Sequence, residues 1–486
     1  MNVAAHLGRL ARQQGDRAAL IEPGGRSVTF AELEERTARI AGGLGLSPGD
    51  RVLLLAPMGI PLYESLIACL RGLFTLVLLD PSAPHVAENL ARIGLSAFIG
   101  SGKAHLLRLK HSELRGLERY VATGFTVLPH RRLRAIDGEP LGPLDPDPEF
   151  PALLTFTTGS TGRPKTVARS HRFLDAQRSI LTEHMGLGPQ DIDLPTLPVF
   201  LLNSLAAGAT CVLPDADLRR VDSVDPARVI PQLRGCTSTS GSPAFYAPIA
   251  KALVDAQETL PGLKKLFTGG ARVPPSLLED LVRVCPNARI EVVYGSTEAE
   301  PIASIGAREV LGETAAAERE GQGSCVGRPV PQIDLRVVSP GTLEAAERIG
   351  EVVVSGEHVN RGYFEDPSAD AENKLADGEV IWHRTGDTGY LDERGRVWLV
   401  GRVKDMVGGL HPFMLEGRAD ARDWVRRSAL VEVHGEPVLA VVGDGPTDAL
   451  AEELGVRVEG VEAIPLDPRH NAKIDRAALR GILEGR

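Results

Sequence analysis

The sequence predicts an α/β protein in which helix-covered sheets are followed by a β-rich segment and a small α+β unit. Short aliphatic runs alternate with helical patterns from residue 28 to residue 100, as is typical of a parallel sheet. After Gly350 the strand signals become short and are separated by turns, and a break near 401–409 precedes the last segment. The 486 residues exceed the roughly 250–300 that one hydrophobic core supports, so two or more domains are expected.

Helices and strands alternate through the N-terminal part of the chain. The beginning of the chain carries apolar side chains at helical spacing with arginines between them, which predicts an amphipathic helix rather than a targeting segment. Thr29 followed by Glu32 is the pattern of a helix N-cap with a capping box. A helix is expected at 61–71, and aliphatic strands are expected at 51–55, 73–79 and 96–100.

The pattern changes along the rest of the chain. Residues 136–151 are rich in Pro, Asp and Gly and predict a loop. From 190 to 300 strand and helix signals alternate again, and the charged, alanine-rich residues 306–323 predict an exposed helix. Beyond Gly350, short strands are expected at 351–355, 388–391 and 396–400.

The composition argues against several classes of protein. The formal net charge of −10 is unlike that of a dedicated nucleic-acid binder, which shows a basic face or stripe. The five cysteines are scattered and never form a C-x-x-C pair, so buried thiols in a reducing cytoplasm are expected rather than zinc or disulfides. The most apolar stretch, 65–79, is interrupted by Arg71 and Gly72 and is too short to span a bilayer, so no transmembrane segment is expected.

A segment rich in hydroxyls and glycines directly follows the apolar residues 153–156. Glycines let the backbone approach an anion, successive N–H groups form a nest for phosphate oxygens, and hydroxyls and cations add donors. The spacing differs from that of a P-loop, in which the second glycine directly precedes lysine. A flexible turn of the same composition is the alternative. The residues of this loop are Thr157, Thr158, Gly159, Ser160, Thr161, Gly162, Arg163, Pro164 and Lys165.

The order of hydroxyls, glycines, proline and lysine in this loop resembles the signature loop of the adenylate-forming superfamily, which includes acyl-CoA synthetases, luciferases and nonribosomal-peptide adenylation domains. Thr166 departs from the glycine that usually ends the loop. Further motifs of the superfamily follow in the same order over essentially the whole chain. They are Gly269-Gly270-Ala271, Tyr294-Gly295-Ser296-Thr297-Glu298, Thr385-Gly386-Asp387, Gly401-Arg402-Val403-Lys404-Asp405 and residues 467–476, which contain Lys473.

The resemblance implies a site for ATP and Mg²⁺. By this resemblance Tyr294 lies against adenine, Thr297 reaches phosphate, and Glu298 holds the metal, while Asp387 and Arg402 bind the ribose. A hard cation with oxygen ligands neutralises phosphate charge during the displacement, and a carboxylate is a good acceptor for ribose hydroxyls. The remaining nucleotide-binding residues implied by these motifs are Gly269, Gly270, Ala271, Gly295 and Ser296.

The resemblance also implies a domain organisation. A large N-terminal domain of two helix-covered sheets spans 1–401 and includes a β-rich subdomain at about 330–401. A small, mobile α+β lid domain spans 402–486, and Asp405 is the hinge. Lys473 is the catalytic lysine that bridges the carboxylate oxygen and the α-phosphate, a contribution of about 3–4 kcal/mol for a charge aimed at the transition state. Thr297 and Glu298 complete the catalytic set.

Several segments resemble one branch more closely, the β-lactone synthetases of bacterial olefin biosynthesis. The sharpest is Arg-His-Asn-Ala at 469–472, directly before Lys473. The resemblance implies ATP-dependent activation of a 2-alkyl-3-hydroxy fatty acid as acyl-AMP. The 3-hydroxyl then attacks the acyl carbon and gives a β-lactone, AMP and pyrophosphate. This branch associates with partner enzymes of the olefin pathway.

An apolar acyl pocket is expected for such a substrate. Its predicted residues are Val199, Phe200, Leu201, Ser242 and Pro243. His171 and His470 are candidate bases for the hydroxyl, although a structural role is the better interpretation of each. A fatty-acyl- or aryl-CoA ligase, or an acyl-AMP ligase that loads a carrier protein, remains the alternative enzyme. A catalytically inactive binding or scaffold homologue is the alternative of another class.

Overall fold

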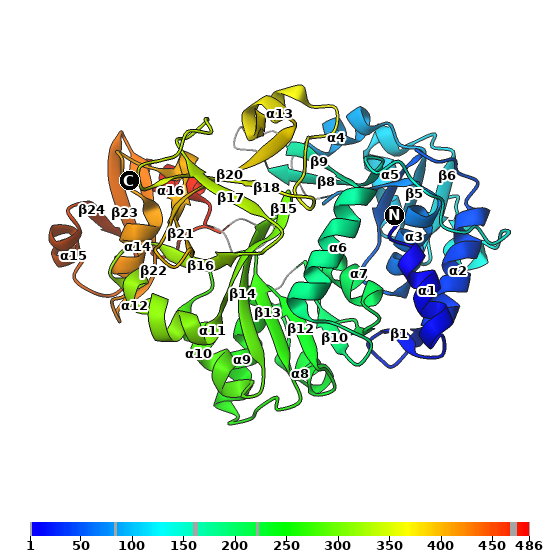
Figure 1. The fold of residues 1–486 in the computed structure, drawn as a ribbon, viewed down its shortest axis with the longest axis horizontal. Helices are drawn as coiled ribbons and strands as arrows, with labels where there is room; N and C mark the ends of the chain where they lie inside the picture. The colour runs from blue at the N-terminus through cyan, green and yellow to red at the C-terminus, as the bar shows by residue number, and fades with distance from the viewer. Residues whose placement is uncertain (1, 82–84, 159–163, 220–222, 467–473, 486) are drawn as a thin grey trace. The chain divides into compact units, whose positions relative to one another are not determined.

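The computed structural model describes residues 2–81, 85–158, 164–219, 223–466 and 474–485. They form two compact units, each a mixture of sheets and helices (Figure 1), which confirms the predicted α/β class. Unit 1 contains Met1–Asp215 and Glu357–Glu372, and unit 2 contains Ala216–Gly356 and Asn373–Arg486. The predicted division into 1–401 and 402–486 stays a prediction.

A seven-stranded sheet forms the centre of unit 1. Its strand order is β7-β6-β5-β3-β4-β8-β9, and all neighbours are parallel except the antiparallel pair β8 and β9. The three strands predicted in the first hundred residues are confirmed. The strands are β3 (Arg51–Leu55), β4 (Thr75–Leu78), β5 (Ala97–Gly100), β6 (Arg119–Ala122), β7 (Arg131–Arg132), β8 (Pro151–Thr158) and β9 (Pro164–Ser170).

Consecutive residues of the central strands belong to two different hydrophobic cores. In β3, Val52 and Leu54 pack in one core and Leu53 packs in the other. Helices α2 (Phe30–Gly43) and α3 (Ile60–Arg71) supply side chains to the first core, and α4 (Val86–Ile93) supplies them to the second. Because strand side chains alternate between the two faces, a strand covered on both faces must be apolar throughout, as the sequence indicated.

The predicted start of α2 is confirmed in detail. The Thr29 hydroxyl accepts a hydrogen bond from the Glu32 amide at 3.2 Å, and the Glu32 carboxylate accepts one from the Thr29 amide at 2.8 Å. This reciprocal pair is the capping box that the sequence predicted.

Four further strands of unit 1, which form the end of a 14-stranded sheet, and the neighbouring helices complete the unit. The strands have the order β10-β11-β1-β2, and helix α1 confirms the amphipathic helix expected at the beginning of the chain. The bounds are α1 (Ala5–Gln14), β1 (Ala18–Ile21), β2 (Ser27–Thr29), α6 (His171–Met185), β10 (Ile192–Pro195), α7 (Pro198–Ala206) and β11 (Thr210–Val212).

The larger sheet of unit 2 changes from parallel to antiparallel along its order. Strands β12, β13 and β14 are parallel, and β15 to β21 pair in antiparallel fashion, which confirms the β-rich region beyond Gly350. The strands are β12 (Ser238–Gly241), β13 (Lys265–Gly269), β14 (Arg289–Ser296), β15 (Ala299–Gly306), β16 (Ser324–Pro329), β17 (Asp334–Val338), β18 (Gly350–Ser355), β19 (Lys374–Asp377), β20 (Val380–Leu391) and β21 (Val397–Arg402). Helices of this part are α8 (Pro226–Arg234), α9 (Pro243–Asp255) and α10 (Pro275–Val284).

The helix expected at 306–323 is confirmed over 307–319, but its expected exposure is wrong, because one side of it is buried. The segment consists of two short helices, α11 (Ala307–Glu309) and α12 (Ala315–Arg319), joined by a wider π-type turn at Val310–Thr314. Glu318 is buried, accepts a hydrogen bond from the Cys325 amide at 3.2 Å, and forms an ion pair with Arg272 at 3.6 Å. The charges of this segment therefore include inward-facing partners, which a charged composition alone does not reveal.

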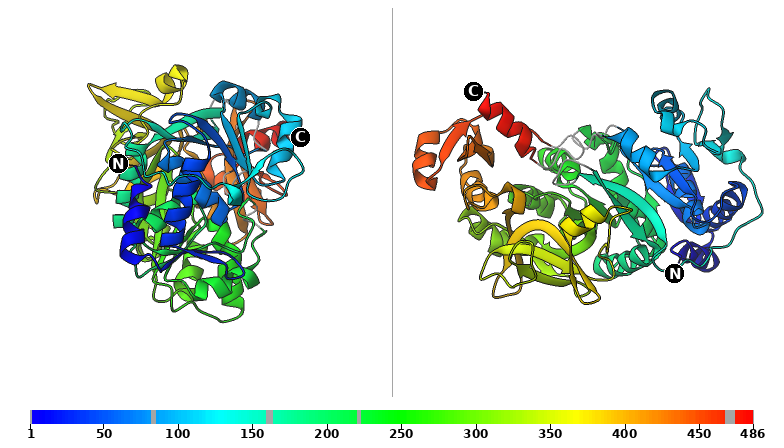
Figure 2. Two further views of the ribbon diagram at one scale, coloured as in Figure 1. Left: turned by 90° about the vertical axis from the view of Figure 1, so that its right-hand side faces the viewer. Right: turned by 90° about the horizontal axis from the view of Figure 1, so that it is seen from above.

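The end of unit 2 has a sheet and cores of its own, as the sequence predicted. Strands β22, β23 and β24 form a three-stranded sheet, and α14 and α16 pack against β22. Figure 2 shows α16, in red, beside the orange strands of this sheet. Separate hydrophobic cores lie on its two faces. The bounds are α14 (Pro412–Asp420), β22 (Val425–Val433), β23 (Glu436–Gly443), α15 (Thr447–Leu454), β24 (Arg457–Gly460) and α16 (Arg476–Glu484).

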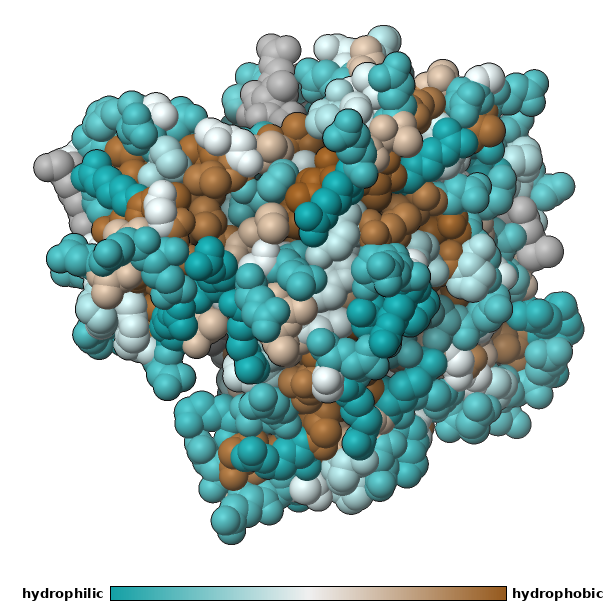
Figure 3. Space-filling model, turned by 60° about the vertical axis from the view of Figure 1, so that its left-hand side comes forward, coloured by the Kyte–Doolittle hydropathy of each residue, from teal (hydrophilic) through white to brown (hydrophobic). Residues whose placement is uncertain are grey.

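The remaining expectations concern burial. All five cysteines are buried and free, as expected. On the face drawn in Figure 3, hydrophilic residues cover most of the surface and hydrophobic residues gather in limited areas. Among the described residues, no helix is both long enough and apolar enough to cross a bilayer.

Candidate functional site

The predicted phosphate loop connects the two strands of the β8–β9 hairpin. Thr157 pairs with Lys165 and Thr158 pairs with Pro164, so the sheet holds the two ends of the loop opposite each other. The loop residues Gly159, Ser160, Thr161, Gly162 and Arg163 lie outside the described residues. Their role in binding phosphate stays a prediction.

Lys165 lies at the start of β9 and is buried. Its ammonium forms a 3.2 Å ion pair with the carboxylate of Glu372, and it lies 5.7 Å from the centre of the Tyr363 ring. Both partners belong to the segment Glu357–Glu372, which is part of unit 1. The cation predicted to reach phosphate is therefore already held by a carboxylate that sequence reasoning did not identify.

The contacts of Thr166 account for a threonine at the position where the superfamily usually has glycine. The residue is fully buried, and its hydroxyl accepts a hydrogen bond from the guanidinium of Arg92. Arg92 is also 3.5 Å from Asp366, and the Thr166 carbonyl accepts a 2.8 Å hydrogen bond from the Phe364 amide. A glycine would leave Arg92 without this acceptor, so the threonine ties the loop's last residue to the segment Glu357–Glu372.

The same segment covers the free edge of β9. Val167 forms a β-bridge with Tyr363, and the Asn360 amide donates a 2.6 Å hydrogen bond to the Ala168 carbonyl. An uncovered edge strand presents unpaired backbone groups, and this segment pairs with them. The strand that carries Lys165 is thereby fixed on both sides.

Three parallel strands of unit 2 bring several predicted residues to one sheet edge. Gly241 pairs with Thr268 in the β12–β13 register, and Gly269 pairs with Val293 in the β13–β14 register. The segments that follow lie at the carboxyl ends of these strands, where parallel sheets bind ligands. They contain Ser242 and Pro243 after β12, Gly269, Gly270 and Ala271 at the end of β13, and Tyr294, Gly295 and Ser296 at the end of β14.

The backbone at this edge requires glycine. A Cβ at Gly269 would lie 2.2 Å from the Val293 carbonyl oxygen, and Gly270 has a φ of +80°, a left-handed conformation that favours glycine. Beside them, the hydroxyls of Thr268 and Ser296 are buried without a hydrogen-bond partner among the described residues. Unpaired buried hydroxyls next to an exposed glycine backbone fit a polar ligand such as a nucleotide.

Tyr294, Asp387 and Arg402 come together although they lie far apart in the sequence. The Tyr294 hydroxyl donates a 2.6 Å hydrogen bond to the Asp387 carboxylate, and the Arg402 guanidinium is 3.2 Å from the other oxygen of that carboxylate. Asp387 and Arg402 are direct partners in the β20–β21 register, which explains the ion pair. The structure thus brings together the predicted adenine residue and both predicted ribose residues.

The electrostatics of this cluster follow from its burial and charge. Burial, together with the neighbouring Asp387 carboxylate, raises the pKa of Tyr294 well above its ordinary value, so the phenol keeps its proton and donates. The Asp387 carboxylate raises the pKa of Arg402, and the more remote carboxylates of Asp405 and Glu298 act in the same direction. Asp387 is therefore an anionic acceptor held between a neutral donor and a cation.

Two further groups shape the position of Asp387. The Asp387 amide donates a 3.1 Å hydrogen bond to the Thr385 hydroxyl, which itself donates to the Val352 carbonyl at 2.8 Å. Gly386 between them has a φ of +73°. The turn in Thr385-Gly386-Asp387 therefore needs both its hydroxyl and its glycine.

Thr297 and Glu298 form the turn between β14 and β15. The strands flank the turn directly, because Ser296 pairs with Ala299. Both residues are half-buried. Among the residues that the structure describes, no group of three or more His, Cys, Asp or Glu could hold a metal ion by itself. Mg²⁺ typically binds through one or two carboxylates together with substrate phosphates, and Glu298 supplies one carboxylate in this turn.

The predicted hinge residue Asp405 contacts the other end of unit 2. Its carboxylate is 3.5 Å from the guanidinium of Arg476, and Arg476 lies 2.7 Å from the buried Glu416. Burial alone would lower the pKa of Arg476, but the Glu416 and Asp405 carboxylates outweigh it and raise the pKa. Arg476 also donates to the Leu430 carbonyl at 2.7 Å. Arg476, from the motif 467–476, therefore joins Asp405 of the motif 401–405 to Glu416 and to β22.

Lys473 and its neighbours 467–472, including His470, lie outside the described residues. The residues on either side of them are described and pair with each other. Leu466 and Ile474 form a β-bridge, and the Asp475 amide donates a 2.9 Å hydrogen bond to the Pro465 carbonyl. The residues that flank 467–473 are therefore neighbours in the fold. The catalytic role of Lys473 stays a prediction.

The predicted acyl-pocket residues have different surroundings. Phe200 is buried on α7, Leu201 packs in the first core of unit 1, and Pro243 is buried at the start of α9. Ser242 caps α9 by accepting a 3.3 Å hydrogen bond from the Phe245 amide. Val199 lines a cavity of about 60 Å³.

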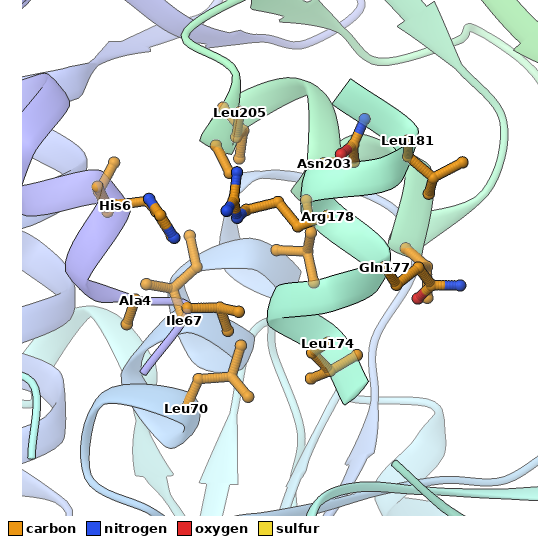
Figure 4. Close-up of a pocket in the computed structure, with 15 residues that line it drawn as sticks. Ala4, His6, Ile67, Leu70, Leu174, Gln177, Arg178, Leu181, Asn203 and Leu205 are labelled. Atoms are coloured by element: carbon orange, nitrogen blue, oxygen red, sulfur yellow. The ribbon is translucent and has the colours of Figure 1, made fainter. Parts of the chain in front are cut away.

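This cavity lies between α1, α3, α6 and α7 (Figure 4). Aliphatic side chains form most of its wall, and His6 and Arg178 lie side by side on it. Both contact Asp175 at 3.1 Å. The centres of water molecules can reach about 60 Å³ of this cavity, which is room for several waters.

His171 is a structural residue rather than an accessible base. It is fully buried at the start of α6, and neither ring nitrogen has a hydrogen-bond partner among the described residues. Burial lowers its pKa to about 4. The structural interpretation of this histidine is the one that its surroundings support.

Sequence reasoning missed several residues of the site. Glu372 and Arg92 belong to no motif, and only the folded chain brings them to Lys165 and Thr166. Arg476 lies in the recognised motif 467–476 without an assigned role, and Glu416 lies outside the motifs named above.

Comparisons with known proteins agree with the motifs. A family model described as AMP-binding enzyme matches residues 7–364. The olefin β-lactone synthetases of Stenotrophomonas maltophilia (strain K279a) and Xanthomonas campestris pv. campestris are both 32% identical to this chain. Each alignment covers 98% of this chain, with 97% and 96% of the respective relative. A feruloyl-CoA synthase from an Amycolatopsis species is 31% identical over 96% of this chain and 95% of its own length.

Solved structures agree on the fold. The ATP-bound MatB of Rhodopseudomonas palustris superimposes with a TM-score of 0.81 at 23% identity and covers 100% of this chain and 99% of its own. At this identity the likeness speaks for the fold alone.

Proposed function

Because the chain belongs to the AMP-binding enzyme family, we propose that it activates a 2-alkyl-3-hydroxy fatty acid with ATP and closes it to a β-lactone. The convergence of Tyr294, Asp387 and Arg402 carries the proposal of nucleotide binding. The full-length similarity to two olefin β-lactone synthetases supports the choice of product.

In this proposal, the nucleoside occupies the carboxyl ends of β13 and β14. Asp387 accepts hydrogen bonds from the ribose hydroxyls, and Arg402 holds the carboxylate in place and faces the ribose. The backbone of Gly269, Gly270 and Ala271 runs along the adenine, with Tyr294 on it. Lys165, Thr297 and the loop residues 157–162 bind the phosphates.

The first half-reaction forms the acyl-AMP. A carboxylate oxygen of the substrate attacks the α-phosphorus of ATP, and pyrophosphate leaves with the electrons of the broken P–O bond. Lys473 lies on the carboxylate and the α-phosphate and stabilises the charge that develops there, a contribution of about 3–4 kcal/mol for such a group. Mg²⁺ at Glu298 would neutralise phosphate charge.

The second half-reaction closes the ring. The 3-hydroxyl oxygen attacks the acyl carbon, the hydroxyl proton is lost, and AMP leaves with the oxygen that joined it to the acyl group. The reactive mixed anhydride offsets the strain of the four-membered ring. The nucleophile is tethered to its target, and such proximity replaces a bimolecular encounter. Val199, Phe200, Leu201, Ser242 and Pro243 are the proposed surroundings of the alkyl chains.

The proposal includes motion and location. We propose that 402–486 move as a lid about Asp405, which Arg476 holds in the present arrangement. We propose further that the enzyme is cytoplasmic and assembles with other enzymes of olefin synthesis. The similarity to two olefin β-lactone synthetases supports this pathway.

A thioester-forming ligase is the second candidate. The 31% identity to a feruloyl-CoA synthase over nearly the whole chain favours it. The two candidates differ in what accepts the acyl group, because a ligase needs a thiol and a ring-closing enzyme needs the substrate's own hydroxyl.

One assay separates them. The purified enzyme is incubated with MgATP and a 2-alkyl-3-hydroxy fatty acid, without any thiol, and the products are analysed by NMR. The proposal expects a β-lactone in an amount equal to the AMP released, and no lactone from the 3-deoxy acid. AMP release that depends on coenzyme A, with no lactone, would contradict ring closure.

A further inference from the structure

Exposed apolar side chains concentrate in one part of unit 1. Eight large hydrophobic side chains are exposed among the described residues, and four of them lie between residues 106 and 127. Phe125 and Val127 are the most exposed, at 80% each, and Leu109 and Leu106 follow at 62% and 51%. Grouped exposed apolar side chains mark a surface that meets an apolar partner.

These four side chains lie on two neighbouring segments. Leu106 and Leu109 are three residues apart on consecutive helical turns, Ala104–Leu106 and α5 (Leu107–Lys110), and so share one face. Phe125 and Val127 flank the buried Thr126 in the loop after β6, so the exposed side chains alternate with a buried one.

The fold holds the two segments side by side. A Cβ at Gly102 would lie 1.6 Å from the Phe125 carbonyl oxygen, so only glycine permits this approach. The Arg108 guanidinium donates to the Pro129 carbonyl at 2.8 Å and stacks 3.5 Å from the centre of the Tyr120 ring. The loop leaves β6, which Figure 1 shows beside α5 in unit 1, and the left view of Figure 2 is turned toward this side.

The same region is basic in an acidic protein. Residues 103–134 contain eight Lys and Arg but only two Asp and Glu, a net charge of +6, whereas the whole chain carries −10. No carboxylate pairs with the exposed cations of this region among the residues that the structure describes. These cations are Lys103, Lys110, Arg115, Arg131, Arg132 and Arg134.

From this combination, we propose that residues 103–134 form a docking surface for an anionic phospholipid bilayer. Lipid headgroups would pair with the cations, and the acyl chains just below would receive Leu106, Leu109, Phe125 and Val127. A nucleic acid offers phosphates but no apolar phase for leucine and valine. The bilayer supplies both kinds of partner within a few ångströms of each other.

The proposal goes beyond the chemistry of the active site, because it states where the enzyme meets its substrate. A fatty acid with two alkyl chains resides in membranes, and an enzyme held on the bilayer meets it there. The attachment is peripheral and reversible, because it depends on a few side chains and on charge.

Vesicle binding of the full-length protein tests the proposal. The protein is sedimented with vesicles of phosphatidylglycerol and phosphatidylcholine, and with vesicles of phosphatidylcholine alone. Binding to the first but not the second is expected, and added salt should weaken it because salt screens the headgroup attraction. No binding to the anionic vesicles, or equal binding to both, would overturn the proposal.

Variants locate the contact. Phe125→Ser with Val127→Ser should lower the partition coefficient by roughly tenfold, and Arg132→Ser with Arg134→Ser by roughly 30-fold. Val380→Ser with Ile482→Ser and Lys251→Ser are matched controls, because these residues are exposed elsewhere and should leave binding unchanged. Unchanged circular dichroism and unchanged turnover of a short-chain acid show that each variant is folded.

Other outcomes are decisive as well. If the Phe125 and Arg132 variants bind vesicles like the wild type, or if the controls lose binding equally, the surface is wrong. If the wild type binds polyuridylate or heparin through Arg132 and Arg134 but not anionic vesicles, the surface recognises polyanions and the bilayer proposal is refuted.

Discussion

The hydroxyl of Tyr294 donates a 2.6 Å hydrogen bond to the carboxylate of Asp387, 93 residues further along the chain. The phenol keeps its proton because burial and the carboxylate raise its pKa. The hydrogen bond therefore fixes the orientation of an acceptor that Arg402 holds from the other side. An anion oriented in this way is suited to a pair of vicinal hydroxyls.

Asp387→Asn should change the enzyme's response to the sugar. A hydrogen bond to a charged group contributes about 1.5–3 kcal/mol, so the wild type should lose roughly 10- to 100-fold in kcat/KM with 2′- or 3′-deoxy-ATP. The variant should be slow with ATP but nearly indifferent to the missing hydroxyl. The measurement is kcat/KM for ATP and both deoxy analogues.

The control for this comparison is Asp377→Asn, an exposed carboxylate of the neighbouring strand β19. Asp377→Asn should lose as much kcat/KM with the deoxy analogues as the wild type does. If Asp387→Asn loses as much kcat/KM with deoxy-ATP as the wild type does, another group binds the ribose.

Glu372→Gln should strengthen ATP binding. The Glu372 carboxylate occupies Lys165, and a phosphate must compete with it. Since a half-exposed ion pair contributes about 0–1 kcal/mol, the KM for ATP should fall by up to about fivefold. Glu357→Gln is the matched control, because Glu357 pairs with Arg172 on the same segment and should leave the KM unchanged. A KM for ATP that rises in Glu372→Gln would contradict competition between Glu372 and phosphate for Lys165.

Arg476→Ala should destabilise the protein. It leaves the Glu416 carboxylate buried without its 2.7 Å partner, and breaking a buried pair in this way lowers the free energy of unfolding by about 3–5 kcal/mol. The double variant Arg476→Met with Glu416→Gln should recover most of the loss, because no buried unpaired charge remains and Asp405 is partly exposed. Urea unfolding measures both. Equal destabilisation of the single and double variants would mean that the charge pair is not the cause.

His171 should make stability depend on pH between neutral and acidic conditions. Its pKa is about 4 in the folded chain and about 6.5 when exposed, so protons bind the unfolded chain first as the pH falls. Its contribution is present above pH 6.5 and is lost as the pH falls toward 4, by about 2 kcal/mol between pH 7 and pH 5. His171→Leu should reduce this loss in urea unfolding at the two pH values, and an equal loss would contradict the assignment.

The sequence predicted the fold where patterns are local. The buried strands of residues 51–100 are apolar on both faces, and Thr29 with Glu32 forms a cap within one helical turn. The helix within 306–323 is confirmed but its exposure is not, because the ion-pair partner of the buried Glu318 is Arg272, which lies far away in the chain.

The same difference between local patterns and non-local contacts applies to the residues of the site. Tyr294, Asp387 and Arg402 were found because each stands in a motif of its own, although only the strand register explains why they touch. Glu372 and Arg92 were missed because their function depends on a non-local contact with β9 and on no residue pattern.

Oxygen labelling tests the central claim most directly. The 2-alkyl-3-hydroxy acid is labelled with ¹⁸O at both carboxyl oxygens and converted with unlabelled MgATP, and the products are analysed by mass spectrometry. Acyl adenylation followed by attack of the 3-hydroxyl predicts one ¹⁸O in AMP and one in the lactone carbonyl. A lactone that retains both labels, with none in AMP, would contradict activation of the carboxylate.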